Sequence, residues 1–568
     1  MKDKDEFYQI LSAIDGLDRA EYGRIIGDFD FGRFVLKINR VPAEGESQVT
    51  LIIVRVPQSV AGFPPHLFNT PVRRTAIEDL LSRKLAEGIR KFAAFNHEGV
   101  ARRRLSVSAG SQKIIPRSSL NVTDENVEAR LYVTLPIHQD RIAAQGAKAV
   151  FFDELPTLVS ASLIHCNLDV DETERFVDTM EDADQLRQAL PTRGMVSFVA
   201  EGSMLSRQGD TDLPDFVSER SISVADDIRI QIDVPNAGSV RGLGVPGGVT
   251  VILGDDHSGR HELMQAIASG IYNHVPGDGR EYVITLPDAV YVAAERNRSV
   301  QRVDLSLFLS SGQEPRKAYS TGQADPVSGQ AASVIEALEV GARALIFDES
   351  DSAPGFLSTD SRLASMLAKG KSRTVPLSAR ARQITDELGV SVIVGGHATV
   401  AEFIPVADTV LLIEDGRVRD VTKDAKQLGV QALKAEAGDL AKSASKARWV
   451  IPSSIDASVG RHDAEIEATS LRVLRFGRTT IDLSGVYQLA DSYQTGTIGL
   501  ILNYAKTRYM DDGRPMREIL DLVDRDLSTD GLECLSREFR GDLARPRRYE
   551  IAAALNRLST LRISHAGE

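Results

Sequence analysis

Apolar residues run along this chain in two patterns, and together they predict alternating strands and helices. Short, mostly apolar runs at residues 249–253, 343–347 and 391–394 are typical of strands buried on both faces of a sheet. The segments 262–269 and 328–338, which follow glycine-containing turns, have helical spacing. Strands that alternate with helices in this way predict an α/β domain in the middle of the chain.

The flanking regions have different patterns. Helical periodicity at 5–14 and 75–95, with strand character at 34–38, 49–56 and 129–135, predicts an α+β domain over residues 1–215 that ends in a polar linker. We expect two antiparallel strands at 227–234 and 239–244 and a strand pair with a tight turn at 409–418. An Ala- and Lys-rich helical connector at 422–445 then leads into a mainly helical remainder. The predicted domains are therefore 1–215, 216–425 and 426–568.

A glycine-bounded loop follows the first central strand and precedes a helix. It reads Gly254-Asp255-Asp256-His257-Ser258-Gly259-Arg260-His261. Such a loop can wrap a polyphosphate in backbone N–H groups at a helix N-terminus. The complete phosphate-loop motif continues with Lys and then Ser or Thr, which contact the phosphates and Mg²⁺. Arg260 retains the positive charge of the lysine but carries it on a longer, planar guanidinium group. The imidazole of His261 is a poor ligand for magnesium. We therefore expect nucleotide binding to survive better than hydrolysis.

Two further segments complete the candidate site. The strand at 343–347 ends in Asp348, which would hold Mg²⁺, and Glu349, which would polarise the attacking water. An acidic pair can also mark nothing more than the point where a strand returns to solvent. The turn Ser328-Gly329-Gln330 lies shortly before this strand. The order and spacing of all three segments favour a single ATP site.

Several long blocks resemble the family of ATPases of the ABC class, which carry an N-terminal domain of their own. The resemblance extends over nearly the whole chain, including the segments 29–32, 198–203, 271–283, 330–343 and 541–558. It implies an α/β ABC-type P-loop ATPase core between an α+β N-terminal domain and a mainly helical C-terminal domain. It also implies ATP or ADP as ligand, with Mg²⁺.

The resemblance assigns roles to further residues. His397 lies where the wider superfamily of ABC ATPases places a histidine that contacts the γ-phosphate, whereas the family itself is Gly- and Ser-rich here. It could equally bond a nearby backbone carbonyl at the strand end. Glu295, or alternatively Gln301, lies at the position of the superfamily's metal-sensing glutamine loop. The alternative interpretation of this segment is a solvated charged turn. The turn at Ser328 and Gly329 would cap the γ-phosphate of a second copy, which implies a homodimer with two bound ATP molecules.

Three other segments allow a functional and a structural interpretation. Residues 108–113 resemble a second phosphate-type loop but lack a strand-loop-helix frame. The arginine clusters at 102–104 and 545–548 could contact the phosphates of a nucleic acid, or could pair with neighbouring acids. For the second cluster we expect the structural role.

Composition limits the remaining possibilities. With 568 residues, 42% of them hydrophobic and 26% charged, the chain can form about three domains without disulfides. Its two cysteines, Cys166 and Cys534, have no metal-ligand spacing, and a reducing cytoplasm is the expected location. No segment approaches the roughly 18 apolar residues of a membrane span, so no membrane partner is expected. The net charge of −13 argues against a generally cationic surface.

These observations predict an ABC-class ATPase, not a transporter, that hydrolyses ATP weakly at a dimer interface. The alternative is a binding module in which nucleotide clamps a dimer as a switch with little or no turnover. A scaffold that has lost nucleotide binding is the third interpretation. The switch and the scaffold stay alternatives because Arg260 and His261 replace the Lys and the Ser or Thr of the complete phosphate-loop motif.

Overall fold

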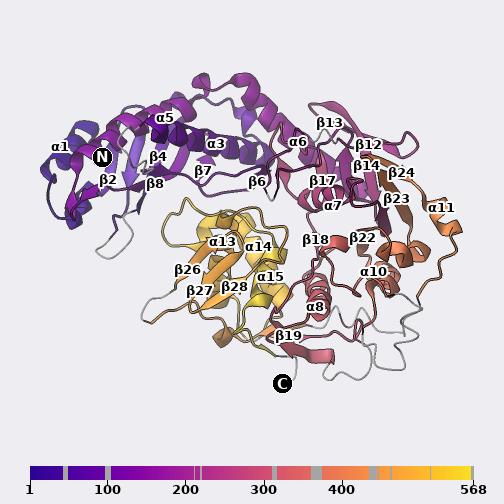
Figure 1. The fold of residues 1–568 in the computed structure, drawn as a ribbon. Coiled ribbons are helices and arrows are strands. Elements are labelled where there is room, and N and C mark those ends of the chain that lie inside the picture. Colours follow the sequence, from indigo (N-terminus) through magenta and orange to yellow (C-terminus); the bar gives the residue numbers. More distant parts are fainter. Residues whose placement is uncertain are drawn as a thin grey trace. The chain divides into compact units, whose positions relative to one another are not determined.

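The computed structural model describes residues 1–42, 49–95, 104–209, 211–217, 221–309, 316–359, 374–433, 443, 447–460, 464–511 and 513–564. Contacts divide the chain into two compact units, whose elements are labelled in Figure 1. The first unit comprises Met1–Glu181 with Leu532–Arg545, and the second comprises Asp182–Gly531 with Pro546–Glu568. This division falls near residue 181, whereas the sequence places its first boundary at 215. The bounds of the three predicted domains stay predictions.

A mostly antiparallel sheet forms the centre of the first unit. Its strand order is β1, β2, β3, β4, β8, β5, with β7 also paired to β8, and only β1 and β2 run parallel. The strands are β1 (Lys2–Asp3), β2 (Gly27–Asp30), β3 (Val35–Ile38), β4 (Val49–Pro57), β5 (Leu105–Ser106), β7 (Leu120–Val122) and β8 (Asn126–Thr134). Val, Ile and Thr dominate β4, and their branched side chains favour extended backbone. The strands predicted at 34–38, 49–56 and 129–135 are confirmed.

Among the described residues, the first unit also contains helices and three further short strands. They are α1 (Lys4–Ala13), α2 (Gln58–Ala61), α3 (Pro71–Phe95), α4 (Ala144–Lys148), α5 (Leu155–Ser162), β6 (Lys113–Ile114), β9 (Ile137–His138) and β10 (Arg141–Ile142). A capping box starts α1, because the Asp3 carboxylate accepts from the amides of Asp5 and Glu6. The helices predicted at 5–14 and 75–95 are thereby confirmed as α1 and α3. The later segment 532–545 joins this unit through the amide of Ser118, which donates to the Leu543 carbonyl.

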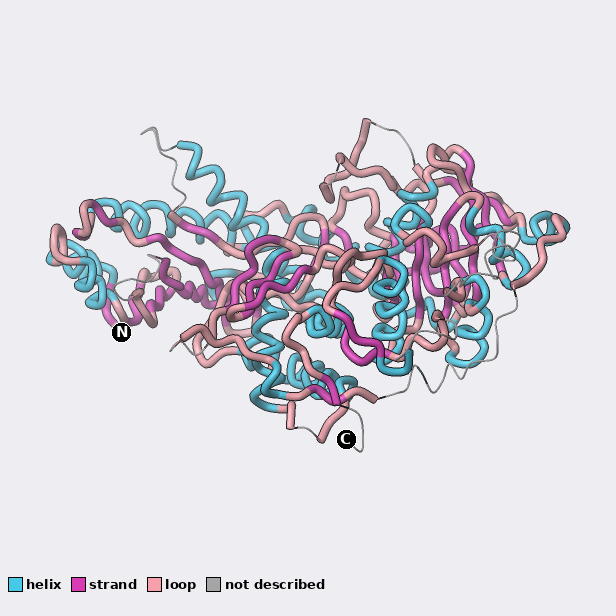
Figure 2. Tube along the Cα trace, turned by 60° about the horizontal axis from the view of Figure 1, so that its bottom comes forward, coloured by secondary structure: helices cyan, strands magenta, loops and turns pink. Residues whose placement is uncertain are grey.

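The second unit contains the expected α/β sheet. Its order is β12, β24, β23, β15, β22, β21, β18, and every pair except β23 with β24 is parallel. The strands are β12 (Ser223–Val224), β15 (Val249–Leu253), β18 (Ala289–Tyr291), β21 (Ala344–Asp348), β22 (Ser391–Gly396), β23 (Thr409–Glu414) and β24 (Arg417–Asp420). Figure 2 shows these strands side by side with helices next to them. The helices are α7 (Arg260–Ser269), α8 (Pro326–Glu339), α10 (Ala381–Leu388) and α11 (Thr422–Gln427).

The predicted tight turn between β23 and β24 is confirmed. Asp415 and Gly416 both have positive φ, 47° and 76°, as a two-residue hairpin turn of type I′ requires. The connector predicted at 422–445 begins as α11, and most of its remainder lies outside the described residues.

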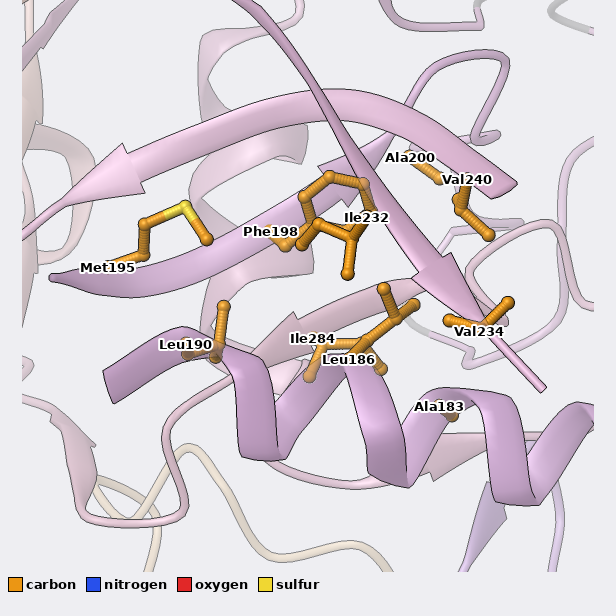
Figure 3. Packing of buried hydrophobic residues seen from close by; sticks show 10 residues of the cluster. All are labelled: Ala183, Leu186, Leu190, Met195, Phe198, Ala200, Ile232, Val234, Val240 and Ile284. Carbon is orange, nitrogen blue, oxygen red and sulfur yellow. The ribbon is translucent and has the colours of Figure 1, made fainter. Parts of the chain in front are cut away.

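A second, antiparallel sheet has the order β13, β14, β11, β17. Its strands are β11 (Met195–Ala200), β13 (Arg229–Val234), β14 (Gly238–Pro246) and β17 (Val283–Thr285). Figure 3 shows the core between this sheet and α6 (Val170–Thr192), which contributes Ala183, Leu186 and Leu190. The antiparallel pair predicted at 227–244 is confirmed, but β11 joins it from the segment that the sequence assigned to the N-terminal domain.

The last third of the second unit combines helices with a small sheet. It contains β25 (Trp449–Val450), β26 (Ile466–Ser470), β27 (Val473–Phe476), β28 (Thr479–Asp482), α13 (Ser492–Arg508), α14 (Met516–Thr529), α15 (Arg548–Arg557) and β29 (Ile563–Ser564). The shorter strands β16 (Asn273–His274), β19 (Val300–Val303) and β20 (Tyr319–Thr321) lie earlier in the unit's sequence. Of the helices in the described ranges, none has both the length and the apolar character needed to cross a bilayer.

Candidate functional site

The glycine-bounded loop lies between β15 and α7, at the carboxyl end of the parallel strands. Gly254 has no room for a side chain, since an added Cβ would lie 2.4 Å from Ser258 Oγ and 2.9 Å from Ile413 Cγ2. Gly259 precedes α7 with φ +93°, a conformation that favours glycine. At the start of α7, Ser258 Oγ accepts from the Arg260 amide at 3.3 Å. The start of a helix carries backbone N–H groups without intrahelical partners, so a helix that opens directly after this loop suits a phosphate.

Arg260 turns inward from the start of α7 and is 2% exposed. Its Nη1 donates to both carboxylate oxygens of Asp348, at 2.9 and 2.8 Å, and its Nε donates to the Gly254 carbonyl at 3.1 Å. Nη2 lies 3.9 Å from the Asp256 carboxylate. The cation expected to bridge phosphates is therefore tied to the carboxylate expected to hold the metal.

Asp348 ends β21 and is fully buried. Burial raises its pKa, but the neighbouring His261 and the charge of Arg260 outweigh that effect and lower the pKa to about 2. His261 Nδ1 lies 3.5 Å from Asp348 Oδ2, and this carboxylate raises the pKa of His261 against the opposing effect of burial. Asp348 is therefore ionised and held between two basic side chains.

These contacts show whether the site fits Mg²⁺. Both oxygens of Asp348 are engaged by Arg260, and His261 stands where a hydroxyl ligand would be. In the described part of the chain, no group of three or more His, Cys, Asp or Glu side chains is arranged to hold a metal ion. Hard cations prefer several oxygen ligands. The residues in this arrangement do not fit a magnesium ion.

Glu349 and His397 come together through the Glu349 side chain and the His397 backbone. Glu349 Oε2 accepts a hydrogen bond of 2.5 Å from the backbone amide of His397, directly after β22. The His397 residue itself is exposed. The structure thus fixes the Glu349 carboxylate beside Asp348 at the ends of adjacent strands.

The turn at residues 328–330 opens α8. The Asp325 carboxylate caps the helix by accepting from the amides of Val327 and Ser328, each at 3.1 Å. Gln330 is fully buried and donates to the Val292 carbonyl, while its own side-chain oxygen accepts from the Ala353 amide. Gln330 therefore connects segments of the core, and Ser328 and Gly329 begin the helix.

Glu295 belongs to a separate buried ion pair. Arg557, at the end of α15, donates from Nε to Glu295 Oε2 at 2.9 Å and from Nη2 to Oε1. Gly485 packs directly on this carboxylate. Burial raises the pKa of Glu295, but the charge and hydrogen bonds of Arg557 together with the charge of Arg298 lower the pKa below its ordinary value. Sequence reasoning missed Arg557 as a partner, although it lies in the 541–558 block that carries the family resemblance.

The second phosphate-type loop has the wrong polarity for an anion. Its carbonyls at Gly110, Ser111 and Lys113 all accept from the guanidinium of Arg83, so carbonyl oxygens surround a cation there. Ser108 also bonds within the unit, through its carbonyl to Ser119. This loop is organised by an internal arginine.

The second arginine cluster has the structural role that the sequence favoured. Arg547 donates to the carbonyls of Pro287 and Ala289 and pairs with Glu550 at 2.5 Å. Arg548 pairs with Asp521 at 2.7 Å. In the first cluster, residues 102 and 103 lie outside the described residues, and Arg104 donates to the Gly146 carbonyl.

A glycine loop between a central parallel strand and a helix, with an acidic pair at the end of β21, two strands away in the same sheet, is typical of a P-loop ATPase. Family models agree. The P-loop domain of the ABC-class ATPases matches residues 169–448, and the N-terminal domain of the ABC-class ATPases matches residues 4–166. The chain belongs to the family of ABC-class ATPases. A third model, the MRB1590 C-terminal domain, matches residues 465–564.

Individual relatives are distant. The chain is 23% identical over 287 residues to the uncharacterized protein MJ1628 of Methanocaldococcus jannaschii, which covers 47% of this chain and 60% of that relative. Among solved structures, cbiO1 from Clostridium perfringens, part of the ABC transporter complex cbiONQ, is similar over 41% of this chain and 91% of its own, with 15% identity and a TM-score of 0.25. An ATP-binding subunit of an ABC transporter is similar over 42% of this chain and 96% of its own, with 14% identity and a TM-score of 0.22.

Proposed function

We propose that this protein binds ATP and ADP at the loop between β15 and α7 and hydrolyses ATP slowly. Residues 254–259 cradle the phosphates with backbone amides, Arg260 supplies positive charge, and Glu349 orients the attacking water. A homodimer completes each site, with Ser328 and Gly329 of one copy facing the phosphates bound by the other.

The buried ion pair of Arg260 with Asp348 carries this proposal. It keeps a cation beside the loop, which supports nucleotide binding. It also neutralises the carboxylate that would hold a metal. Metal-assisted charge stabilisation contributes much of the rate of phosphoryl transfer, so its weakening supports slow turnover.

The second candidate function is a nucleotide-gated switch without turnover, and the same ion pair favours it. The two candidates share the binding step and differ only in phosphate release. Nucleic-acid binding and a cytoplasmic location stay predictions from the sequence.

Calorimetric titration with ATP and with ADP tests the binding step. We expect heat of binding with both nucleotides and a rate of phosphate release below about one per second, the lower end of typical enzymes. Gly259→Val should abolish binding, because valine is strained at φ +93°. Gly322→Ala is the matched control, since nothing lies within 4 Å of its Cβ position. Absence of heat with either nucleotide would contradict the proposal, and binding without phosphate release would favour the switch.

A further inference from the structure

Arg260 has five N–H donors on three nitrogens, and its hydrogen bonds within the described residues come from Nε and Nη1. Nε donates to the Gly254 carbonyl, and Nη1 donates to the Asp348 carboxylate, within hydrogen-bond distance of both its oxygens. Nη2 makes no hydrogen bond to the described residues, and its charged neighbour is Asp256 at 3.9 Å. The Asp256 side chain is 89% exposed and therefore screened by water. Two donors of a buried, fixed cation thus remain on the loop side.

A metal ion in an ATPase site of this kind joins a strand-end carboxylate to the phosphates. Here the guanidinium lies on that carboxylate, and Asp348 is completely buried. A magnesium ion could reach Asp348 only by displacing Arg260, which would leave the guanidinium buried without its anion. His261 offers nitrogen in place of the hydroxyl oxygen that would complete the metal site.

We propose that the guanidinium of Arg260 replaces the divalent cation, so that this site takes ATP and ADP without Mg²⁺. Nη1 stays on Asp348, and Nη2 donates to a phosphate oxygen above the loop. This inference rests on the proposed function, because it requires that the loop bind nucleotide.

The test is nucleotide affinity in excess Mg²⁺ and in EDTA, measured by calorimetry with ATP and with ADP. We expect the two Kd values for each nucleotide to agree within about threefold. Binding that requires Mg²⁺, with Kd at least about tenfold lower when the metal is present, would overturn the inference and leave the proposed function intact. Absence of binding in both conditions would overturn the two together.

A double variant makes the test specific to this position. Arg260→Lys with His261→Ser restores an ammonium, which cannot reproduce the bidentate contact, and a hydroxyl that can serve a metal. Its nucleotide affinity should become dependent on Mg²⁺ by about tenfold or more. Arg419→Lys, at an exposed position of β24, is the matched control and should stay independent of the metal. The unfolding transition of the double variant shows whether it folds. If it folds and its nucleotide affinity is still the same with and without Mg²⁺, the result contradicts the role of Arg260.

Discussion

Arg260 is both a candidate ligand contact and a part of the core. The guanidinium and the Asp348 carboxylate are 2% and 0% exposed, so water does not screen their attraction. A pair of this kind adds little net stability compared with apolar residues, but loss of one partner leaves a buried charge uncompensated. An assay of nucleotide binding on an alanine variant at this position would therefore mix a binding effect with unfolding.

The coupling between these two residues can be measured directly. We predict that Arg260→Met lowers the free energy of unfolding by about 3–5 kcal/mol, because Asp348 stays buried and charged. Arg260→Met with Asp348→Asn should recover much of this loss, since asparagine is neutral and can still accept from the Ser350 amide. Urea unfolding followed by the fluorescence of Trp449, the chain's one tryptophan, measures both.

Arg419→Met is the control for that experiment, because the Arg419 side chain is 49% exposed in its pair with Glu414. Its effect should stay within about 1 kcal/mol. If Arg260→Met costs no more than this control, the buried pair does not have the role assigned to it.

At the scale of elements, buried ion pairs hold α8, α15 and the loop after β18 together. Arg298 donates to both oxygens of Glu336 on α8, and Glu295 in the same loop pairs with Arg557 on α15. Arg448 contacts both helices, through Glu339 and Asn556. Through this network α15 contacts the loop that contains Glu295, which the resemblance associates with metal sensing.

The network also contains contacts that could not be predicted from the sequence. The strands, the glycine loop and the acidic pair were predictable because each depends on local periodicity and turn chemistry. The partner of Glu295 lies 262 positions away, and no local pattern encodes such a pairing. The inward turn of Arg260 was also missed, since the sequence gives a residue type and not a side-chain direction. The pairing of β11 with β14 could not be predicted for the same reason, because an apolar run does not specify the sheet that it joins.

The link between Glu295 and α15 gives the element-scale prediction. Arg557→Leu should leave the Glu295 carboxylate buried without its partner, which costs about 3–5 kcal/mol. Hydrogen exchange should quicken in residues 290–299 and 548–557, the two segments that the pair joins. Glu295→Gln in the same chain should slow it again. Arg475→Leu, whose side chain is 45% exposed, serves as control, and equal exchange in the two arginine variants would contradict the prediction.

At the scale of the whole molecule, the chain supplies one glycine loop and one helix-opening turn at residues 328–330. The second unit contains both, and the family resemblance implies that the turn of one copy serves the loop of another. Glu349 is the residue through which this arrangement can be tested, because its carboxylate is held by the His397 amide and does not form part of the Arg260 pair. Its charge can therefore be removed without breaking that pair.

We predict that Glu349→Gln stops whatever hydrolysis the protein performs and accumulates an ATP-bound dimer. Glutamine keeps an oxygen for the His397 amide and the contacts of the bound state, but it cannot act as a base. Sedimentation velocity should show dimers with ATP and monomers with ADP, in Mg²⁺ and in EDTA alike if Arg260 replaces the metal. Glu387→Gln, on an exposed position of α10, should behave as the unmodified protein does. A sedimentation coefficient that ATP does not change, in a variant that binds ATP by calorimetry, would refute the dimer and leave nucleotide binding as the activity of a single copy.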